Sequence, residues 1–305
     1  MFILILNQFL KMLIIMVLGF ICYKIKLINQ DGNRMFSNLL LMLISPCLIL
    51  TVFQTDYDAE LAKKLFISFI AALISHIIAL AAARILVPAK NNPEYIIERF
   101  AAIYSNCGFI GIPLINSVLG AEGVFYISAY VAVFNLFSWT HGVTLMKGRF
   151  SLRYLKNGVL SPVFLTTLAA ILMYFIKLRL PPVLLDSVEY IASMNTPLAM
   201  LVAGFSVAQA DLQLLLKKSS IYRSCFVKLI VVPLLTLFVL ALSGVAHDII
   251  YVTLIAAACP TAAGTAMMAM RFDRNYAYAS EIFTVSTVFS VLTIPFIILF
   301  ADFLL

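Results

Sequence analysis

Two apolar segments of this chain carry proline and glycine where a membrane-spanning helix would be regular. They read Asn106-Cys-Gly-Phe-Ile-Gly-Ile-Pro113 and Cys259-Pro-Thr-Ala-Ala-Gly-Thr265. Proline lacks a backbone donor and glycine loosens a helix, so each segment frees polar groups that lipid cannot satisfy. Such backbone must pack in protein or line a cavity. Breaks at matching places in two halves point to the midplane substrate site of a transporter.

The composition supports a membrane location, since 63% of the 305 residues are hydrophobic and only 11% are charged. We predict an all-α integral membrane protein, because a soluble domain would need more polar surface. Ten stretches have the roughly 20 apolar residues that a hydrocarbon core of about 30 Å requires. They are residues 3–23, 34–54, 61–86, 97–119, 123–146, 157–177, 184–208, 219–243, 248–270 and 277–302.

The basic residues predict how the chain is oriented. Loops after odd-numbered spans carry most of them, and by the positive-inside rule these loops are cytoplasmic. Both termini then lie outside the cytoplasmic (inner) membrane, and no nucleic-acid partner is needed to explain the charge. The basic residues of the odd loops are Lys24, Lys26, Arg34, Arg84, Lys90, Arg99, Lys147, Arg149, Arg153, Lys156, Lys217, Lys218, Arg223, Arg271 and Arg274.

A weak internal repeat divides the chain into residues 1–153 and 154–305. Ser45-Pro-Cys-Leu-Ile-Leu50 in the second span is similar to Thr196-Pro-Leu-Ala-Met-Leu201 in the seventh. Chance similarity between apolar helices is the alternative. Because five is odd, a second block of five spans begins on the opposite side of the membrane, so the repeats are predicted to be inverted.

The two breaks also predict the charge of the substrate. Each proline suits the first turn of a helix, so half-helices are expected to begin at mid-membrane near Pro113 and Pro260. A helix N-terminus carries a partial positive charge of about 0.5 and unpaired N–H groups. Two such ends facing one site favour an anion.

At these residues the sequence resembles the auxin efflux carrier family, whose bacterial members include permeases for malate, malonate and similar carboxylates. The resemblance spans nearly the whole chain, and the run from Ser105 to Leu114 is its most specific part. Its other residues are Leu18-Gly19-Phe20 through Lys24, Pro46, Pro197, Pro260, Ala279-Ser280 to Ser286-Thr287, and Pro295.

The resemblance implies a bile-acid/sodium symporter-like fold of ten helices in two inverted repeats, with spans 4 and 9 crossing at their prolines. Spans 1, 2, 6 and 7 would form a scaffold that dimerises, and spans 3–5 and 8–10 a transport unit that moves in an elevator-like way. Asn106 would lie at the substrate carboxylate. Many relatives have asparagine after the span 9 proline, whereas this chain has Ala262-Ala-Gly-Thr265. Coordination there would depend on Thr261, Thr265 and backbone amides.

These arguments give a set of candidate residues. For Asn106 the alternative reading is a cap on its own broken helix, and for the Ser286 and Thr287 hydroxyls it is a bond to carbonyls of their own helix. The substrate-binding candidates are Asn106, Gly108, Gly111, Pro113, Asn135, Pro260, Thr261, Gly264, Thr265, Ser286 and Thr287. Three ionisable residues within spans, His76, Lys228 and Glu281, are candidates for ion coupling. For Lys228 and Glu281 an ion pair with each other, or a snorkelling lysine, is the alternative. For His76 it is simple packing.

Absent motifs narrow the class further. The chain has no HExxH, GxSxG or GxxxxGK[ST] motif, so we expect no enzyme. Its five cysteines form no CxxC, and neither a metal nor a cofactor is expected beyond a coupling ion, H⁺ or Na⁺. We predict a secondary transporter for a small mono- or dicarboxylate. The alternatives are a Na⁺-coupled carrier of a neutral or bile-acid-like solute, and a membrane receptor that binds ligand without moving it.

Overall fold

The computed structural model describes residues 2–90, 92–148, 160–209 and 219–305, and the side chains of these except residues 2–6 and 9. Within this part the chain is helical, apart from one β-bridge. Its helices are α1 Phe2–Lys24, α2 Gln30–Leu39, α3 Ser45–Val52, α4 Ala59–Leu86, α5 Tyr95–Ile103, α6 Ile112–Phe137, α7 Val143–Lys147, α9 Pro162–Phe175, α10 Pro182–Ser193, α11 Asn195–Ala208, α12 Ser219–Phe226, α13 Val232–Ala241, α14 His247–Ala258, α15 Gly264–Arg271 and α16 Tyr276–Leu304. Four π-helical segments join some of them: η1 Leu40–Ile44, η2 Cys107–Gly111, η3 Ser138–Gly142 and η5 Val227–Val231.

Each predicted span coincides with one helix or with consecutive helices, although the count of ten membrane crossings stays a prediction. In the described residues six helical stretches are long and apolar enough to cross a membrane, and two more apolar helices are shorter. The six are Gln30–Val52, Ala59–Leu86, Cys107–Lys147, Pro182–Ala208, Ser219–Ala241 and Tyr276–Leu304. The long stretch Cys107–Lys147 turns at Gly120, whose φ of 64° suits glycine, between the predicted spans 4 and 5.

Three of the π-helical segments have a common cause in the sequence. Each ends two residues before a proline, namely Pro46, Pro113 and Pro233. A proline ring inside a helix clashes with the carbonyl four residues earlier, and in each case that carbonyl lies within the π-helical segment. The widened π turn accommodates the ring and lets the helix continue.

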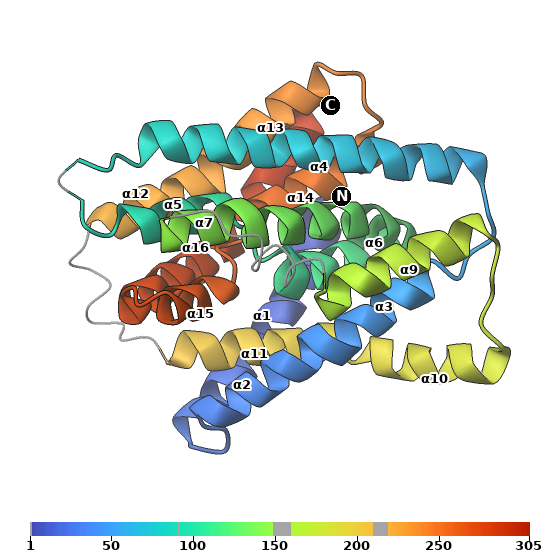
Figure 1. The fold of residues 1–305 in the computed structure, drawn as a ribbon, viewed down its shortest axis with the longest axis horizontal. Helices are drawn as coiled ribbons and strands as arrows, with labels where there is room; N and C mark the ends of the chain where they lie inside the picture. Colours follow the sequence, from blue (N-terminus) through green and yellow to red (C-terminus); the bar gives the residue numbers. More distant parts are fainter. Residues whose placement is uncertain (1, 91, 149–159, 210–218) are drawn as a thin grey trace.

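The helices pack in two groups (Figure 1). One group contains α1, α2, α3, α9, α10 and α11, and the other contains α4 to α7 and α12 to α16. The groups meet where α1 and α11 contact α6 and α16, where α11 contacts η2, and where α3 and α9 contact α6. Within the first group α1 and α11 approach closely, because Gly19 lies against the backbone of Leu201 and Gly204 against that of Met16.

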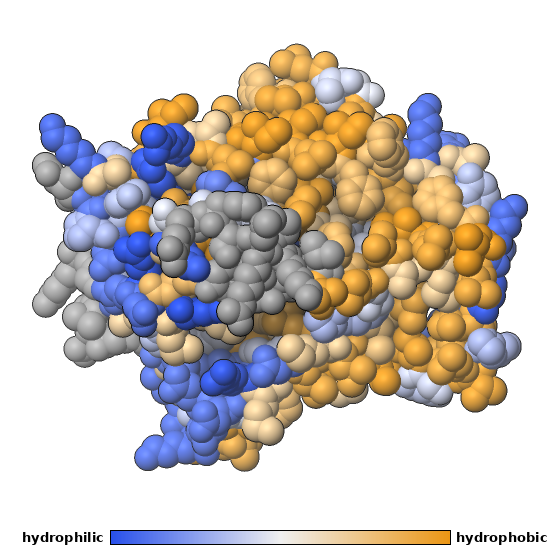
Figure 2. Space-filling model, viewed as in Figure 1, coloured by the Kyte–Doolittle hydropathy of each residue, from blue (hydrophilic) through white to orange (hydrophobic). Residues whose placement is uncertain are grey.

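The surface is apolar along the length of the helices and polar at their ends. Figure 2 shows hydrophobic residues over the middle of the molecule and hydrophilic ones gathered toward its two ends. The α4–α5 connection lies at one end, and the α3–α4 and α9–α10 connections lie at the other (Figure 1). Large apolar side chains such as Ile77 and Phe296 are more than half exposed, which suits contact with lipid.

Part of the predicted topology falls outside the described residues. The boundary after residue 153 lies there, as do the basic residues Arg149, Arg153, Lys156, Lys217 and Lys218. The side of the membrane on which each terminus lies stays a prediction from charge.

Candidate functional site: the crossing of two broken helices

The two predicted breaks are present, and they pair with each other. After α5 the chain is extended at Tyr104, and after α14 it is extended at Cys259. Ser105 and Thr261 form an antiparallel β-bridge. The backbone N–H of Asn106 donates to the Pro260 carbonyl over 2.7 Å, and that of Ala262 donates to the Tyr104 carbonyl over 2.8 Å. Backbone groups freed by the breaks are therefore satisfied across the crossing, as a membrane interior requires.

The prolines, however, do not begin the half-helices as we had expected. The second half of span 4 starts at Cys107, and Pro113 lies within the continuous helix formed by η2 and α6. The second half of span 9 starts at Gly264, four residues after Pro260. Pro260 instead ends α14, because the residue before a proline is driven to an extended conformation, here φ −55° and ψ 147° at Cys259.

Two helix N-termini still lie beside the crossing, and open space adjoins both. They are the start of the Cys107–Lys147 helix and the start of α15. A Cβ added to Gly108 or to Gly264 would meet no heavy atom within 4 Å. The first N–H groups of a helix lack intrahelical partners and carry the positive end of its dipole. The geometry therefore offers room next to two positive backbone poles.

Two buried polar side chains at these helix starts have unused hydrogen-bonding capacity. Asn106 is 5% exposed and Thr265 is fully buried. Neither Asn106 Nδ2 nor Thr265 Oγ1 has a hydrogen-bond partner among the described residues. An unpaired buried polar group costs about 1–3 kcal/mol, so both atoms are suited to receive a polar ligand. Asn106 does not cap its own helix with its side chain.

Other candidates hold the crossing together. The N–H of Thr261 donates to Ser286 Oγ over 3.1 Å, and the Thr261 hydroxyl donates to the Ala101 carbonyl over 3.1 Å. Ser286 thus anchors the extended segment of span 9 to α16. A Cβ added to Gly111 would lie 3.3 Å from Cys259 Sγ, so Gly111 lets the two broken segments pack closely.

The remaining hydroxyl and amide candidates bond to their own helices. Thr287 donates to the Phe283 carbonyl over 2.7 Å, and Asn135 Nδ2 donates to the Val131 carbonyl over 2.9 Å. The Thr287 bond matches the alternative reading given for the hydroxyls. They leave Asn106 and Thr265 as the polar candidates with free atoms at the crossing.

Lys228 lies at the crossing and not at the surface. Its ammonium donates to Ser105 Oγ and, over 2.9 Å, to the Ala257 carbonyl near the end of α14. The side chain is fully buried, so it does not snorkel. No ion pair between described residues involves Lys228, so the pairing with Glu281 is wrong. Glu281 is itself 6% exposed within α16.

His76 belongs to a buried polar cluster formed by side chains of α4, α6 and α13. Its Nδ1 lies 2.8 Å from the Ala72 carbonyl, and its ring packs 4.8 Å from that of Tyr130. Nε2 has no partner among the described residues. Ser75 joins the cluster through contacts of 3.5 Å to the Tyr130 hydroxyl and 3.3 Å to Thr236 Oγ1.

Sequence reasoning missed the contributions of Ser105, Ser75 and Tyr130. Single hydroxyls are common in apolar helices, and no spacing marks these. For Ser105 the available signal was its place directly before Asn106, at the start of the run that resembles the family.

A buried carboxylate near the start of span 4 was also missed. Glu98 is fully buried and accepts hydrogen bonds from Tyr278 Oη at 2.7 Å, Arg223 at 2.7 Å and Asn92 at 3.0 Å. Ser224 donates to its backbone carbonyl. Because its oxygens are satisfied by α12, α16 and a loop, Glu98 joins these elements and leaves no free atom for a ligand.

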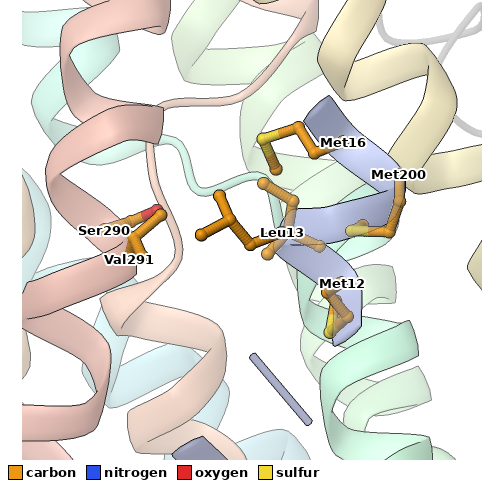
Figure 3. A pocket seen from close by; sticks show the side chains of 7 residues that line it. Met12, Leu13, Met16, Met200, Ser290 and Val291 are labelled. Atoms are coloured by element: carbon orange, nitrogen blue, oxygen red, sulfur yellow. The ribbon is translucent and has the colours of Figure 1, made fainter. Parts of the chain in front are cut away.

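Two cavities among the described residues bear on the location of the substrate. A small cavity of about 10 Å³ lies between the two groups of helices. It is lined by Met12, Leu13, Met16, Ile110, Met200, Ser290 and Val291. Figure 3 shows the α1 methionines and Met200 on one side and Ser290 and Val291 on the other. A larger cavity of about 660 Å³ lies near the start of α4. Four carboxylates, Asp56, Asp58, Glu60 and Glu122, line it with one cation, Lys64, so its net charge is negative and it is poorly suited to an anion.

An all-helical, apolar chain with two broken helices paired at their breaks defines a multi-pass membrane transporter. The described residues contain no cluster of three or more His, Cys, Asp or Glu that could hold a metal. The model of the membrane transport protein family matches the chain twice, over residues 4–153 and 149–298. The chain therefore belongs to this auxin-efflux-carrier-type transport family. Comparison with curated proteins finds no match.

Proposed function

We propose that the protein is a secondary transporter of a small organic anion, a mono- or dicarboxylate, which binds at the crossing. The observation that carries this proposal is the pair of buried, unpartnered atoms Asn106 Nδ2 and Thr265 Oγ1 beside two helix N-termini. Amide and hydroxyl donors, together with positive backbone poles, suit a carboxylate. The open space next to Gly108 and Gly264 gives the ligand room to approach this backbone.

The substrate would enter between the two groups of helices. Ile110 of η2 and Ser290 of α16 border the small cavity there, opposite Met12 and Met200. A volume of about 10 Å³ holds at most a water molecule, so this arrangement is closed. In our proposal α4 to α7 and α12 to α16 move as a transport unit against α1 to α3 and α9 to α11, which exposes the crossing to either side.

The driving force follows from the charge of the substrate. Moving one elementary charge across 100 mV is worth about 2.3 kcal/mol, so a negative interior favours anion export. Uptake would need a cotransported cation or an exchanged anion. The proposal places the protein in the cytoplasmic membrane, where such a potential exists.

A counterflow assay in proteoliposomes tests the proposal. Vesicles loaded with unlabelled malate, malonate, succinate, lactate or acetate are diluted into the labelled compound, with and without pH and Na⁺ gradients. We expect transient accumulation of at least one carboxylate. Accumulation only of neutral or bile-acid-like solutes with Na⁺, or saturable binding without counterflow, would replace the proposal with a sodium symporter or a receptor.

A further inference from the structure

The ammonium of Lys228 lies among oxygen atoms at the crossing. Its two hydrogen-bond acceptors are the Ser105 hydroxyl and the Ala257 carbonyl, 2.9 Å away. Ser105 belongs to the broken segment of span 4, and Ala257 is the second-last residue of α14 in span 9. A side chain from η5, outside both broken helices, therefore bonds to each of them.

The electrostatics of this position explain why a cation is stable there. The last four carbonyls of a helix lack intrahelical partners and form the negative end of its dipole. Ala257 lies in that last turn of α14. Fully buried charges are costly unless they are paired and hydrogen-bonded, and none of the ion pairs between described residues supplies a carboxylate to Lys228. The helix end and the Ser105 hydroxyl thus stabilise the charge.

In transporters with broken helices, unwound carbonyls and half-helix C-termini are also the groups that coordinate Na⁺. We infer that Lys228 is a resident cation: its ammonium occupies, at the crossing, the oxygen-lined position that a coupling Na⁺ would otherwise take. Together with the helix N-termini it keeps the crossing positive without a bound metal ion. Resting on the proposed function, this makes carboxylate transport independent of Na⁺.

Cation-dependent thermal stability of the purified protein tests the inference in detergent without any carboxylate. Lys228→Ala removes the ammonium and three methylenes, which leaves a hole next to Ser105 and Ala257. The melting temperature is measured in choline chloride, NaCl and n-propylammonium chloride at equal ionic strength. We expect the variant to melt several degrees below wild type in choline, and Na⁺ or propylammonium to restore part of the loss.

Lys11→Ala is the matched control, because Lys11 is an exposed lysine within span 1. It should melt near wild type in all three salts. A Lys228→Ala protein whose melting temperature is the same in choline, Na⁺ and propylammonium overturns the inference. So does wild-type protein that Na⁺ stabilises as strongly as the variant.

Lys228→Met tests the inference if the alanine variant cannot be purified in any of the salts. Methionine fills much of the space but removes the ammonium donor from Ser105 and the Ala257 carbonyl, which keep only the 3.5 Å hydrogen bond from the Ser105 hydroxyl to that carbonyl. We expect a lower melting temperature that no cation restores; a methionine variant as stable as wild type overturns the inference. The melting experiments contain no carboxylate, so their outcome is independent of the counterflow assay. If Lys228→Ala shows no cation response, carboxylate transport can still be demonstrated by counterflow. If counterflow fails, the cation response of Lys228→Ala still tests the role of the ammonium.

Discussion

The backbone N–H of Asn106 donates to the carbonyl of Pro260 over 2.7 Å, which joins two helices from opposite halves of the chain at the residues where each is broken. The bond satisfies backbone that lipid would leave unpaired. It also fixes the Asn106 backbone while its side-chain amide nitrogen keeps no partner among the described residues. The backbone of this residue thus holds the crossing together, and its side chain is the part that our proposal assigns to substrate binding.

Replacing Asn106 should weaken substrate binding but leave the fold intact. Asn106→Ala deletes the unpartnered amide and keeps the backbone bond to Pro260. Hydrogen bonds to charged groups contribute about 1.5–3 kcal/mol, so we expect the carboxylate found by counterflow to bind about 10- to 100-fold more weakly. Asn135→Ala is the control, since that amide bonds to its own helix. Equal exchange by both variants would remove Asn106 from the site.

Side chains placed in the open space beside the helix starts should block transport. Gly108→Val and Gly264→Val add bulk where a Cβ meets nothing within 4 Å, so we expect both proteins to fold. We expect counterflow to be lost because the ligand and the valine compete for one volume. Gly111→Val is the contrasting change. Its Cβ would crowd Ile127 and Cys259, so we expect this variant to have a lower melting temperature than the other two. Full transport by the first two variants would contradict this location of the substrate.

The contact between α1 and α11 should be sensitive to a single methyl group. A Cβ at Gly204 would lie 2.0 Å from the Met16 carbonyl oxygen, and one at Gly19 would lie 2.5 Å from that of Leu201. Overpacking of this kind costs about 1–3 kcal/mol, so Gly204→Ala should lower the melting temperature. Gly244→Ala, at a loop position with a φ of +69° and no neighbour within 4 Å, gives the cost of a backbone effect alone. A smaller loss at Gly204 than at Gly244 would refute the close contact.

The carboxylate of Glu98 should contribute to stability and not to substrate binding. Glu98→Gln removes the charge that Arg223 and Tyr278 bond over 2.7 Å each. Arg223 is 37% exposed and can recover hydration, so we expect a loss of about 1–3 kcal/mol, below the cost of breaking a fully buried pair. Chemical unfolding in detergent measures this loss. A large change in carboxylate affinity at unchanged stability would speak against the structural role.

Much of the architecture could be predicted from the sequence because its causes are local. Proline and glycine close together weaken a helix locally, so the breaks near Asn106 and Pro260 were visible in the residues themselves. The residues at which the half-helices start could not be predicted in this way. A π turn lets the helix continue past Pro113, whereas Pro260 ends its helix. Which outcome a proline produces depends on the neighbours that satisfy the freed backbone.

The order of residues alone establishes an apolar helical membrane protein with two interrupted spans and a transporter family's motifs. The tertiary structure decided which atoms meet: Asn106 with Pro260, Lys228 with Ser105 and Ala257, and Glu98 with Arg223. These partners lie far apart in the sequence, and each pairing depends on the geometry of helix crossings. Residue types fix what a polar group needs in lipid, but only the packing of distant helices decides which group supplies it.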